Sequence, residues 1–141
     1  MQISEQPIWQ MAKSLQQGHD IYLNKDTGEF HALPDSQQFT PEGLFRTDVH
    51  RQITDHWDHY LIISAMESWE WFEIMEDFAH EVDEAFHYQL LEVMYQHNPL
   101  DNFRRMVESS SYRPQWDTFR DERFFNYVRD YLKSEDIETE D

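Results

Sequence analysis

Hydrophobic positions recur with helical spacing near the amino end of the chain and again over much of its second half. The first stretch spans residues 3–17 and is followed by a glycine that stops it. The second predicts helices over about residues 66–132, with a break and a new start at Asn98 and Pro99. The apolar stripe before this break holds no proline or glycine, so one long helix and two helices with a kink near Asp83 both remain open. That stripe consists of Phe72, Met75, Ala79, Val82, Phe86, Leu90 and Val93.

Between the helical stretches the pattern changes to short β-prone runs. Residues 21–23 and 30–33 flank an Asp-x-Gly turn, which predicts a β-hairpin over about residues 20–33. Gly28 is expected to take the left-handed position that a type I turn with a bulge requires. The apolar run at residues 60–63 is too short for its period to decide, which leaves a third strand open. The predicted fold class is therefore α+β, predominantly α-helical, with one small amino-terminal β-hairpin or sheet.

The length of 141 residues favours a single domain. We expect this domain to span residues 1–133. Residues 134–141, of which five are acidic, are expected to form a disordered acidic tail. Within the domain, residues 34–45 have the composition of a loop and residues 46–57 that of a polar helix. Ser64, with Glu67 three residues later, and Ser68 are rival caps for the helix that follows.

The composition sets limits on the chemistry. The chain has no cysteine, which excludes disulfides, thiolate zinc sites, iron–sulfur clusters and a cysteine nucleophile. The absence of cysteine also fits a reducing compartment, so a cytoplasmic location is expected. Aromatic residues make up 16% of the chain and bury large areas each, so a folded aromatic core is expected beneath an acidic surface.

The charge balance narrows the range of partners. The chain carries 11 Lys and Arg against 29 Asp and Glu, a formal net charge of −18. This charge repels nucleic-acid phosphates and anionic lipids, so direct nucleic-acid binding is disfavoured and a basic protein partner is expected. No apolar run reaches transmembrane length and the first residues do not resemble a secretory signal, so no membrane association is expected.

Four segments stand out by their order along the chain. They are YLNKDTGE at residues 22–29, SWEWFEIMEDF at 68–78, NPLDNF at 98–103 and WDTFR at 116–120. Together they resemble the uncharacterised bacterial protein family UPF0158, over roughly residues 20–132. The resemblance implies a small soluble bacterial protein, and it supplies no reaction and no catalytic residue.

Enzymatic motifs find little support. Residues 26–28 read Asp-Thr-Gly, as in aspartic proteases, but that chemistry needs two aspartates sharing a proton, and a hairpin turn explains the motif better. The chain has three glycines and no Gly-x-Ser-x-Gly elbow, so phosphate-binding loops and a serine nucleophile are not indicated. No catalytic residue is predicted.

Two groups of histidines and acids are candidates for a metal site. The first follows the carboxylate-x-x-His spacing of di-iron bundles and comprises Asp77, His80, Glu84 and His87. The second comprises His50, His56 and His59. The first group is expected on a helix face opposite the apolar stripe, which favours a solvated charged face. No cofactor is predicted, and a metal-dependent enzyme or metal-binding protein remains an alternative function.

The arginines are concentrated in the last third of the chain. Residues 52–103 contain twelve Asp and Glu and no Lys or Arg, so the arginines are the nearest cations for this acidic stretch. We expect them to pair across helices with it, and Arg120 and Arg123, which share the aromatic face of the last helix, are the principal candidates for structural ion pairing. The alternative is an anion- or nucleic-acid-binding regulator that uses this Arg-rich helix.

Trp69 and Trp71 are two residues apart, so one helix cannot bury both. An exposed tryptophan is typical of interfaces. We therefore predict an interaction surface at Trp69, Glu70 and Trp71. The alternative is an irregular first turn in which both tryptophans pack. The favoured function is that of a non-enzymatic acidic domain that acts by binding another protein.

Overall fold

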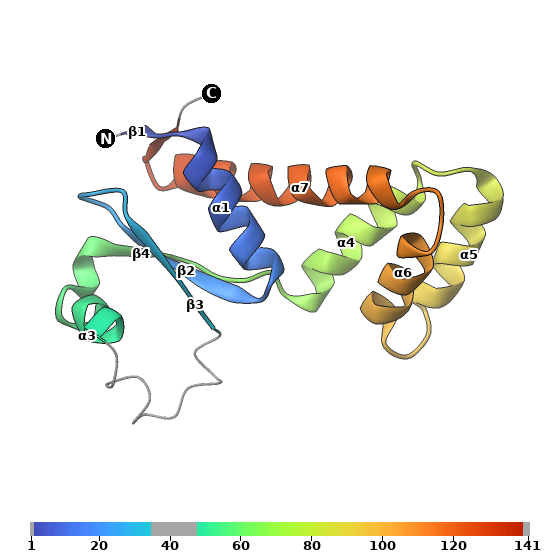
Figure 1. The fold of residues 1–141 in the computed structure, drawn as a ribbon, viewed down its shortest axis with the longest axis horizontal. Coiled ribbons are helices and arrows are strands. Elements are labelled where there is room, and N and C mark those ends of the chain that lie inside the picture. Colours follow the sequence, from blue (N-terminus) through green and yellow to red (C-terminus); the bar gives the residue numbers. More distant parts are fainter. Residues whose placement is uncertain (1, 35–47, 140–141) are drawn as a thin grey trace. The chain divides into compact units, whose positions relative to one another are not determined.

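The fold is α+β and predominantly helical, as predicted (Figure 1). The computed structural model describes residues 2–34 and 48–139, without the side chains of residues 34, 48–50 and 54. The loop expected over residues 34–45 therefore lies almost wholly outside the described residues.

The chain divides into two compact units, where the sequence analysis expected one domain. Unit 1 combines the chain up to Ala65 with the chain from Phe124 onward, and unit 2 is Met66–Arg123. Each unit is described by itself below.

Unit 1 combines short strands with helices. Its elements are β1 (Gln2–Ile3), α1 (Glu5–Gln16), β2 (His19–Asn24), β3 (Phe30–Pro34), α3 (Asp48–Asp55), the 3-10 helix η2 (Trp57–His59), β4 (Tyr60–Ile63), the end of α7 (Arg113–Ser134) and β5 (Glu138–Thr139). Helix α1 buries the positions that its period predicts, namely Ile8, Met11, Ala12 and Leu15. Full burial of a large apolar side chain contributes about 1.5–3 kcal/mol, so this stripe anchors α1 in the unit.

The three-stranded antiparallel sheet has the order β3-β2-β4, so the run at residues 60–63 forms a third strand. Ile21 pairs with Ala32 on one side and with Ile63 on the other. Ile21 and Leu23 are fully buried, because alternate residues of a strand face one side of the sheet.

The predicted hairpin joins β2 to β3. The N–H of Asn24 donates to the carbonyl of Glu29 at 2.8 Å, which closes the loop between them. Gly28 has φ +80°, so the expected left-handed glycine is confirmed.

The end of the chain differs from the expected disordered tail. Asp136 has φ +61°, its N–H donates to the carbonyl of Lys133, and the N–H of Ile137 donates to the carbonyl of Leu132. This is the Schellman arrangement, which ends α7 and reverses the chain. The segment Glu138–Thr139 then pairs in parallel with Gln2–Ile3, and Thr139 is buried. Backbone pairing with β1 therefore orders these residues despite their acidic neighbours.

Unit 2 is built from helices. They are α4 (Ser68–Ala79), α5 (Glu84–Met94), α6 (Pro99–Glu108) and the first part of α7. Helices α5 and α6 lie side by side (Figure 1). The stripe that began at Phe72 is thus carried by two helices, and Asp83 caps the second by accepting from the N–H of Phe86 at 2.9 Å.

The remaining helix boundaries show one success and one error. Helix α6 begins at Pro99 after Asn98, as predicted, and Asn98 turns the chain with φ +56°. The cap of α4 is Glu67, so both predicted serine caps were wrong.

Three aromatic rings form the core of unit 2. Trp116 lies 5.2 Å from Phe78 and 5.0 Å from Phe103 between ring centroids, both in edge-on geometry. All three are essentially inaccessible to solvent. Edge-on aromatic pairs contribute about 0.5–1.5 kcal/mol beyond area burial, so these rings fix α4, α6 and α7 together.

Candidate protein-interaction site

Two glutamates organise the first turn of α4. The backbone N–H of Glu67 donates to Glu70 Oε1 at 3.2 Å. The indole Nε1 of Trp69 donates to Glu67 Oε2 at 2.7 Å. Carboxylates are stabilising at a helix start, where backbone N–H groups lack partners and the helix dipole is positive. The side chain of Glu70 therefore helps to hold the helix end, while Glu67 restrains the ring of Trp69.

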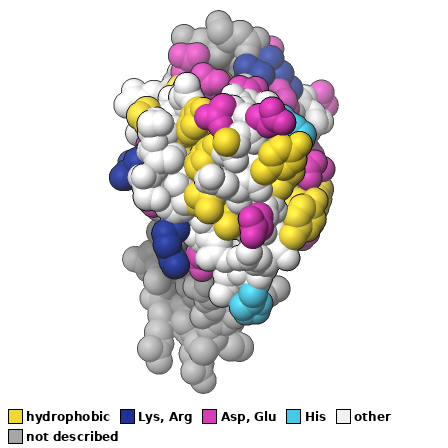
Figure 2. Space-filling view, turned by 90° about the vertical axis from the view of Figure 1, so that its right-hand side faces the viewer, with side chains coloured by type: hydrophobic (Ala, Val, Ile, Leu, Met, Phe, Trp, Pro, Cys, Tyr) yellow, Lys and Arg dark blue, Asp and Glu magenta, His cyan; other side chains and the backbone are white. Residues whose placement is uncertain are grey.

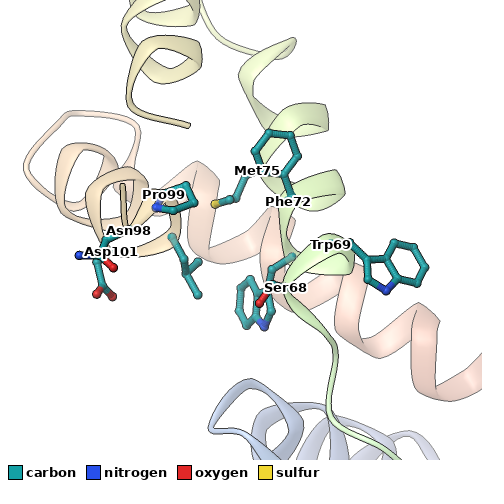
Figure 3. Close-up of a pocket in the computed structure, with 9 residues that line it drawn as sticks. Ser68, Trp69, Phe72, Met75, Asn98, Pro99 and Asp101 are labelled. Carbon is teal, nitrogen blue, oxygen red and sulfur yellow. The ribbon is translucent and has the colours of Figure 1, made fainter. Parts of the chain in front are cut away.

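The two tryptophans of this turn have different environments. Trp69 is 59% exposed and Trp71 is partly buried. In Figure 3 the indole of Trp69 extends outward from the first turn of α4. Sequence spacing predicted that one of the two rings is exposed, and the structure identifies Trp69 as the more exposed one.

A pocket of about 500 Å³ opens beside this turn, between α4 and α6. We call it the α4–α6 pocket; it is lined by Ser68, Trp69, Trp71, Phe72, Met75, Asn98, Pro99, Leu100 and Asp101. Phe72 and Met75 are contributed by α4 and lie opposite Pro99 at the start of α6 (Figure 3). The lining is mostly apolar, with a few polar groups at its ends, which is the usual character of a recognition pocket.

Local sequence explains how the pocket forms. The left-handed Asn98 and the fixed φ of Pro99 start α6 so that its first turn faces α4. Phe72 and Met75, three residues apart, present one side of α4 to that turn. The sequence analysis identified the Asn98-Pro99 helix start, but it could not show which helix this start faces. It therefore did not assign Phe72, Met75, Pro99 or Leu100 to a binding site.

The apolar surface extends beyond the pocket onto α5. Tyr95, which is 75% exposed, packs edge-on against Phe72 with ring centroids 6.0 Å apart. Tyr88 on the same helix is 62% exposed. Figure 2 shows hydrophobic side chains gathered on the face that carries α5 and α6, with Asp and Glu around and between them.

The charge of unit 2 is strongly negative. It contains fourteen Asp and Glu against five Arg and no Lys. Two of these arginines already contact carboxylates. Arg123 Nη1 lies 2.6 Å from Asp77 Oδ2, so it joins α7 to α4. Arg120 instead contacts Asp117 at 3.4 Å and Asp121 at 3.1 Å, both on its own helix, and thus differs from the expected cross-helix pairing.

A hydrogen bond links the α4–α5 corner to the turn before α7. The hydroxyl of Tyr112 donates to Asp83 Oδ2 at 2.6 Å, and its ring stacks on Phe86 with centroids 5.1 Å apart. The hydrogen bond from Tyr112 lowers the pKa of Asp83 below its ordinary value of 3.8, and the hydrogen bond from the N–H of Phe86 lowers it further by a smaller amount. The same contact raises the pKa of Tyr112 above 10.0.

The first histidine group does not share one helix face, because α4 ends at Ala79. The Nδ1 of His87 lies 2.5 Å from the carbonyl oxygen of Ala79, and the rings of His80 and His87 are 4.9 Å apart. Asp77 contacts Arg123, and Glu84 lies exposed in the first turn of α5.

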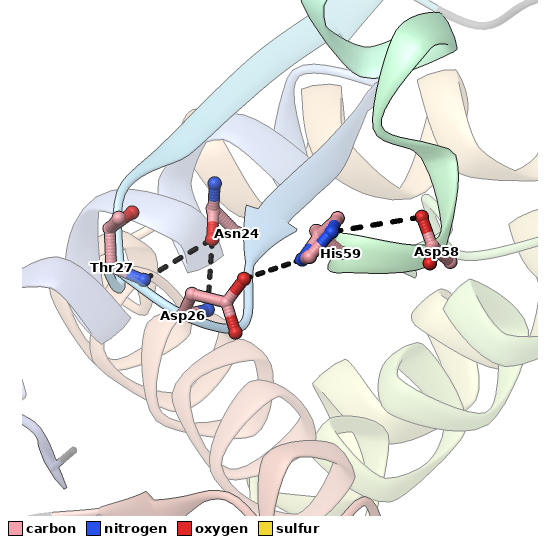
Figure 4. Close-up of polar contacts among 5 residues, drawn as sticks. All are labelled: Asn24, Asp26, Thr27, Asp58 and His59. Carbon is pink, nitrogen blue, oxygen red and sulfur yellow. Dashed lines mark hydrogen bonds and ion pairs between the residues drawn. The ribbon is translucent and has the colours of Figure 1, made fainter.

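The second histidine group lies in unit 1. His59 Nδ1 is 2.5 Å from Asp26 Oδ2 and its Nε2 is 3.9 Å from Asp58 Oδ1 (Figure 4). The ring of His56 is 5.9 Å from that of His59, and the side chain of His50 is outside the described residues. Across the described ranges, no three His, Asp or Glu side chains come close enough together to hold a metal ion.

The Asp-Thr-Gly motif lies in the hairpin loop. Asn24 Oδ1 accepts from the backbone N–H of Asp26 at 2.8 Å and from that of Thr27 at 3.2 Å (Figure 4). This is the local bonding by which Asn stabilises turns. The Asp26–His59 contact then joins the loop to η2. The contacts of the Asp-Thr-Gly motif are therefore explained by the structure of the hairpin loop.

The arrangement as a whole is that of an acidic, predominantly helical α+β protein with an apolar pocket beside an exposed tryptophan. The chain belongs to UPF0158, an uncharacterised protein family whose model matches residues 3–140. The predicted family is thus confirmed, over nearly the whole chain. Comparison with curated proteins and with solved structures gave no match. No helix among the described residues has the length and apolar character needed to cross a membrane.

Proposed function

We propose that this protein is a non-enzymatic binding protein of the bacterial cytoplasm, and that the α4–α6 pocket receives an apolar side chain of a basic partner protein. The observation that carries the proposal is an exposed tryptophan at the rim of an apolar pocket, within a stretch of chain that has no Lys or Arg. Tryptophan is enriched among the residues that dominate binding energy. The absence of cysteine supports the reducing compartment.

Charge supports the choice of partner. The acids of unit 2 exceed its arginines by nine, and two of the arginines contact carboxylates of the unit itself. A negative surface of this kind speeds association with a positive one and opposes association with nucleic acid or another acidic protein. The partner is therefore a protein that combines Lys or Arg with an exposed apolar side chain.

The alternative functions have less support among the described contacts. A metal site needs at least three convergent ligands, and none of the described His, Asp and Glu form such a group. An anion site on α7 needs accessible guanidinium groups, and both Arg120 and Arg123 already contact aspartates.

The test begins with affinity capture from a bacterial cell at low and high salt, followed by purification of the captured protein and measurement of its Kd. The Trp69→Ala variant is expected to weaken binding about tenfold, or about 1.4 kcal/mol. Trp57→Ala is the matched control, because Trp57 is 58% exposed and belongs to unit 1.

Both variants are expected to keep the melting temperature of the parent protein, since both rings are largely exposed. Equal Kd values for the two variants would contradict the proposal. So would a Kd for Trp69→Ala equal to that of the parent.

A further inference from the structure

A second groove lies in unit 2, at the end of α4 and the beginning of α7. Its volume is about 460 Å³, and we call it the α4–α7 groove. Phe78, Pro114 and Phe119 supply its apolar lining, and Glu81 and Glu122 supply its carboxylates. We propose that this groove binds the side chain of an arginine or lysine of the partner protein. The inference rests on the proposed function, because it identifies where the basic partner is held.

The chemistry of the groove fits a long cationic side chain. Phe78 is buried and forms part of an apolar wall, while Glu81 and Glu122 are exposed. Neither carboxylate forms an ion pair with another described residue. An arginine or lysine side chain is apolar along its stem and charged at its tip, so the stem matches the rings and the tip matches the glutamates. A purely apolar ligand would bury these carboxylates without a partner, which is unfavourable.

The protein already holds one of its own arginines in a similar way. The guanidinium of Arg123 lies 5.7 Å from the ring centroid of Phe119 and pairs with Asp77 at 2.6 Å. An aromatic ring of α7 and a carboxylate of α4 thus bind a guanidinium together. The groove offers a similar combination, since Phe119 also lines it and the carboxylate of Glu81 comes from the segment that follows the end of α4. A partner's arginine would repeat this internal arrangement.

The direct test uses a small probe, N-acetyl-arginine methylamide, titrated into the ¹⁵N-labelled full chain in about 150 mM salt to screen non-specific attraction. We expect saturable chemical-shift changes centred on Glu81, Thr118 and Phe119, with a dissociation constant on the order of millimolar. The matched probe is N-acetyl-citrulline methylamide, which has nearly the same shape without the charge. Equal shift changes with both probes, or changes spread over the whole acidic surface, would overturn the inference.

Paired variants separate local binding from overall charge. The double variant Glu81→Gln/Glu122→Gln is expected to weaken arginine binding about fivefold, because both substitutions remove a contact to the cation. Glu73→Gln/Glu92→Gln removes the same charge from two other exposed acids of unit 2 and is expected to leave binding unchanged. An equal loss in the two variants would show that only net charge matters and would contradict the groove.

The captured partner distinguishes the two sites. If Trp69→Ala weakens partner binding while Glu81→Gln/Glu122→Gln does not, the groove inference fails and the proposed function stands. If the groove variant weakens binding and Trp69→Ala does not, the α4–α6 pocket is not the site and the groove remains. Loss in both variants supports both sites.

Discussion

The two units hold their elements together in different ways. In unit 1, backbone hydrogen bonds between strands and the backbone turn at Asp136 act together with the buried apolar face of α1. In unit 2, side chains join the helices, through the rings of Phe78, Phe103 and Trp116 and the hydrogen bond between Tyr112 and Asp83. A helix satisfies its own backbone, so neighbouring helices meet only through side chains and leave hollows where they diverge. Both candidate binding sites lie in hollows of this kind in the helical unit.

The largest expected effect tests whether unit 2 depends on its aromatic core. Phe103→Ala removes a fully buried ring that contacts Phe78 and Trp116, and it should lower the free energy of unfolding by about 3–5 kcal/mol. Hydrogen exchange should show the greatest loss of protection within residues 66–123. Phe103→Leu keeps most of the volume and should cost much less. Equal loss of protection in β2 and β4 would contradict the separation into two units.

A smaller loss of stability is expected when the hydrogen bond between Tyr112 and Asp83 at the α4–α5 corner is removed. Tyr112→Phe removes the hydroxyl that lowers the pKa of Asp83, so the variant should be less stable at neutral pH. Because the pKa of Asp83 is lowered in the folded protein, this contribution is present above pH 3.8 and is lost as the pH falls through the folded-state pKa. The pKa of Tyr112 is raised, so its contribution is present below pH 10.0 and is lost as the pH rises through the folded-state value.

Urea unfolding at several pH values checks this prediction. The parent protein and Tyr112→Phe should converge at both extremes of pH and differ between them. A difference that stays constant across the range would show that packing of the ring, and not the hydrogen bond, is responsible.

A substitution at the backbone turn that ends α7 in unit 1 should increase stability, in contrast to the two substitutions in unit 2. Asp136 adopts φ +61°, a conformation that glycine adopts without strain. Asp136→Gly is therefore expected to raise the free energy of unfolding by about 0.5–1 kcal/mol, while Asp136→Val should lower it. Chemical denaturation of both variants measures the effect, and loss of stability in Asp136→Gly would show that the aspartate side chain has a role of its own.

The smallest expected effect compares two arginines of α7. Arg123→Met breaks a partly exposed contact between helices and should cost about 0.2–1 kcal/mol in low salt. Arg120→Met removes contacts within one helix and should cost about 0.2–0.5 kcal/mol. Both losses should shrink in 1 M salt, as thermal unfolding can show. A larger cost for Arg120→Met would mean that pairing along α7 matters more than pairing across to α4.

Features that depend on neighbouring residues were predictable from the sequence. Helical spacing located α1 and its buried face, the Asp-x-Gly turn located the hairpin with Gly28, and Asn98-Pro99 located the start of α6. Each depends on local backbone preference or on a period of a few residues, and these act over the length of one element. The order of four short segments was likewise enough to identify the family.

Features that depend on distant contacts were not predictable. The helix break after Ala79 is held by Asp83 and Tyr112, twenty-nine residues apart, and β5 is ordered by a strand at the other end of the chain. The same holds for the exposure of Trp69, the partners of Arg120, and the two hollows beside α4.

The sequence by itself therefore determined most of the helical segments, the hairpin, the charge and the family of this protein. Only the tertiary structure decided which tryptophan faces solvent, which arginine joins two helices, and where apolar surface is left uncovered. The physical reason is that propensity and periodicity are properties of one segment. A pocket, an ion pair between helices or a paired strand is a property of two segments, whose meeting depends on the packing of the whole unit.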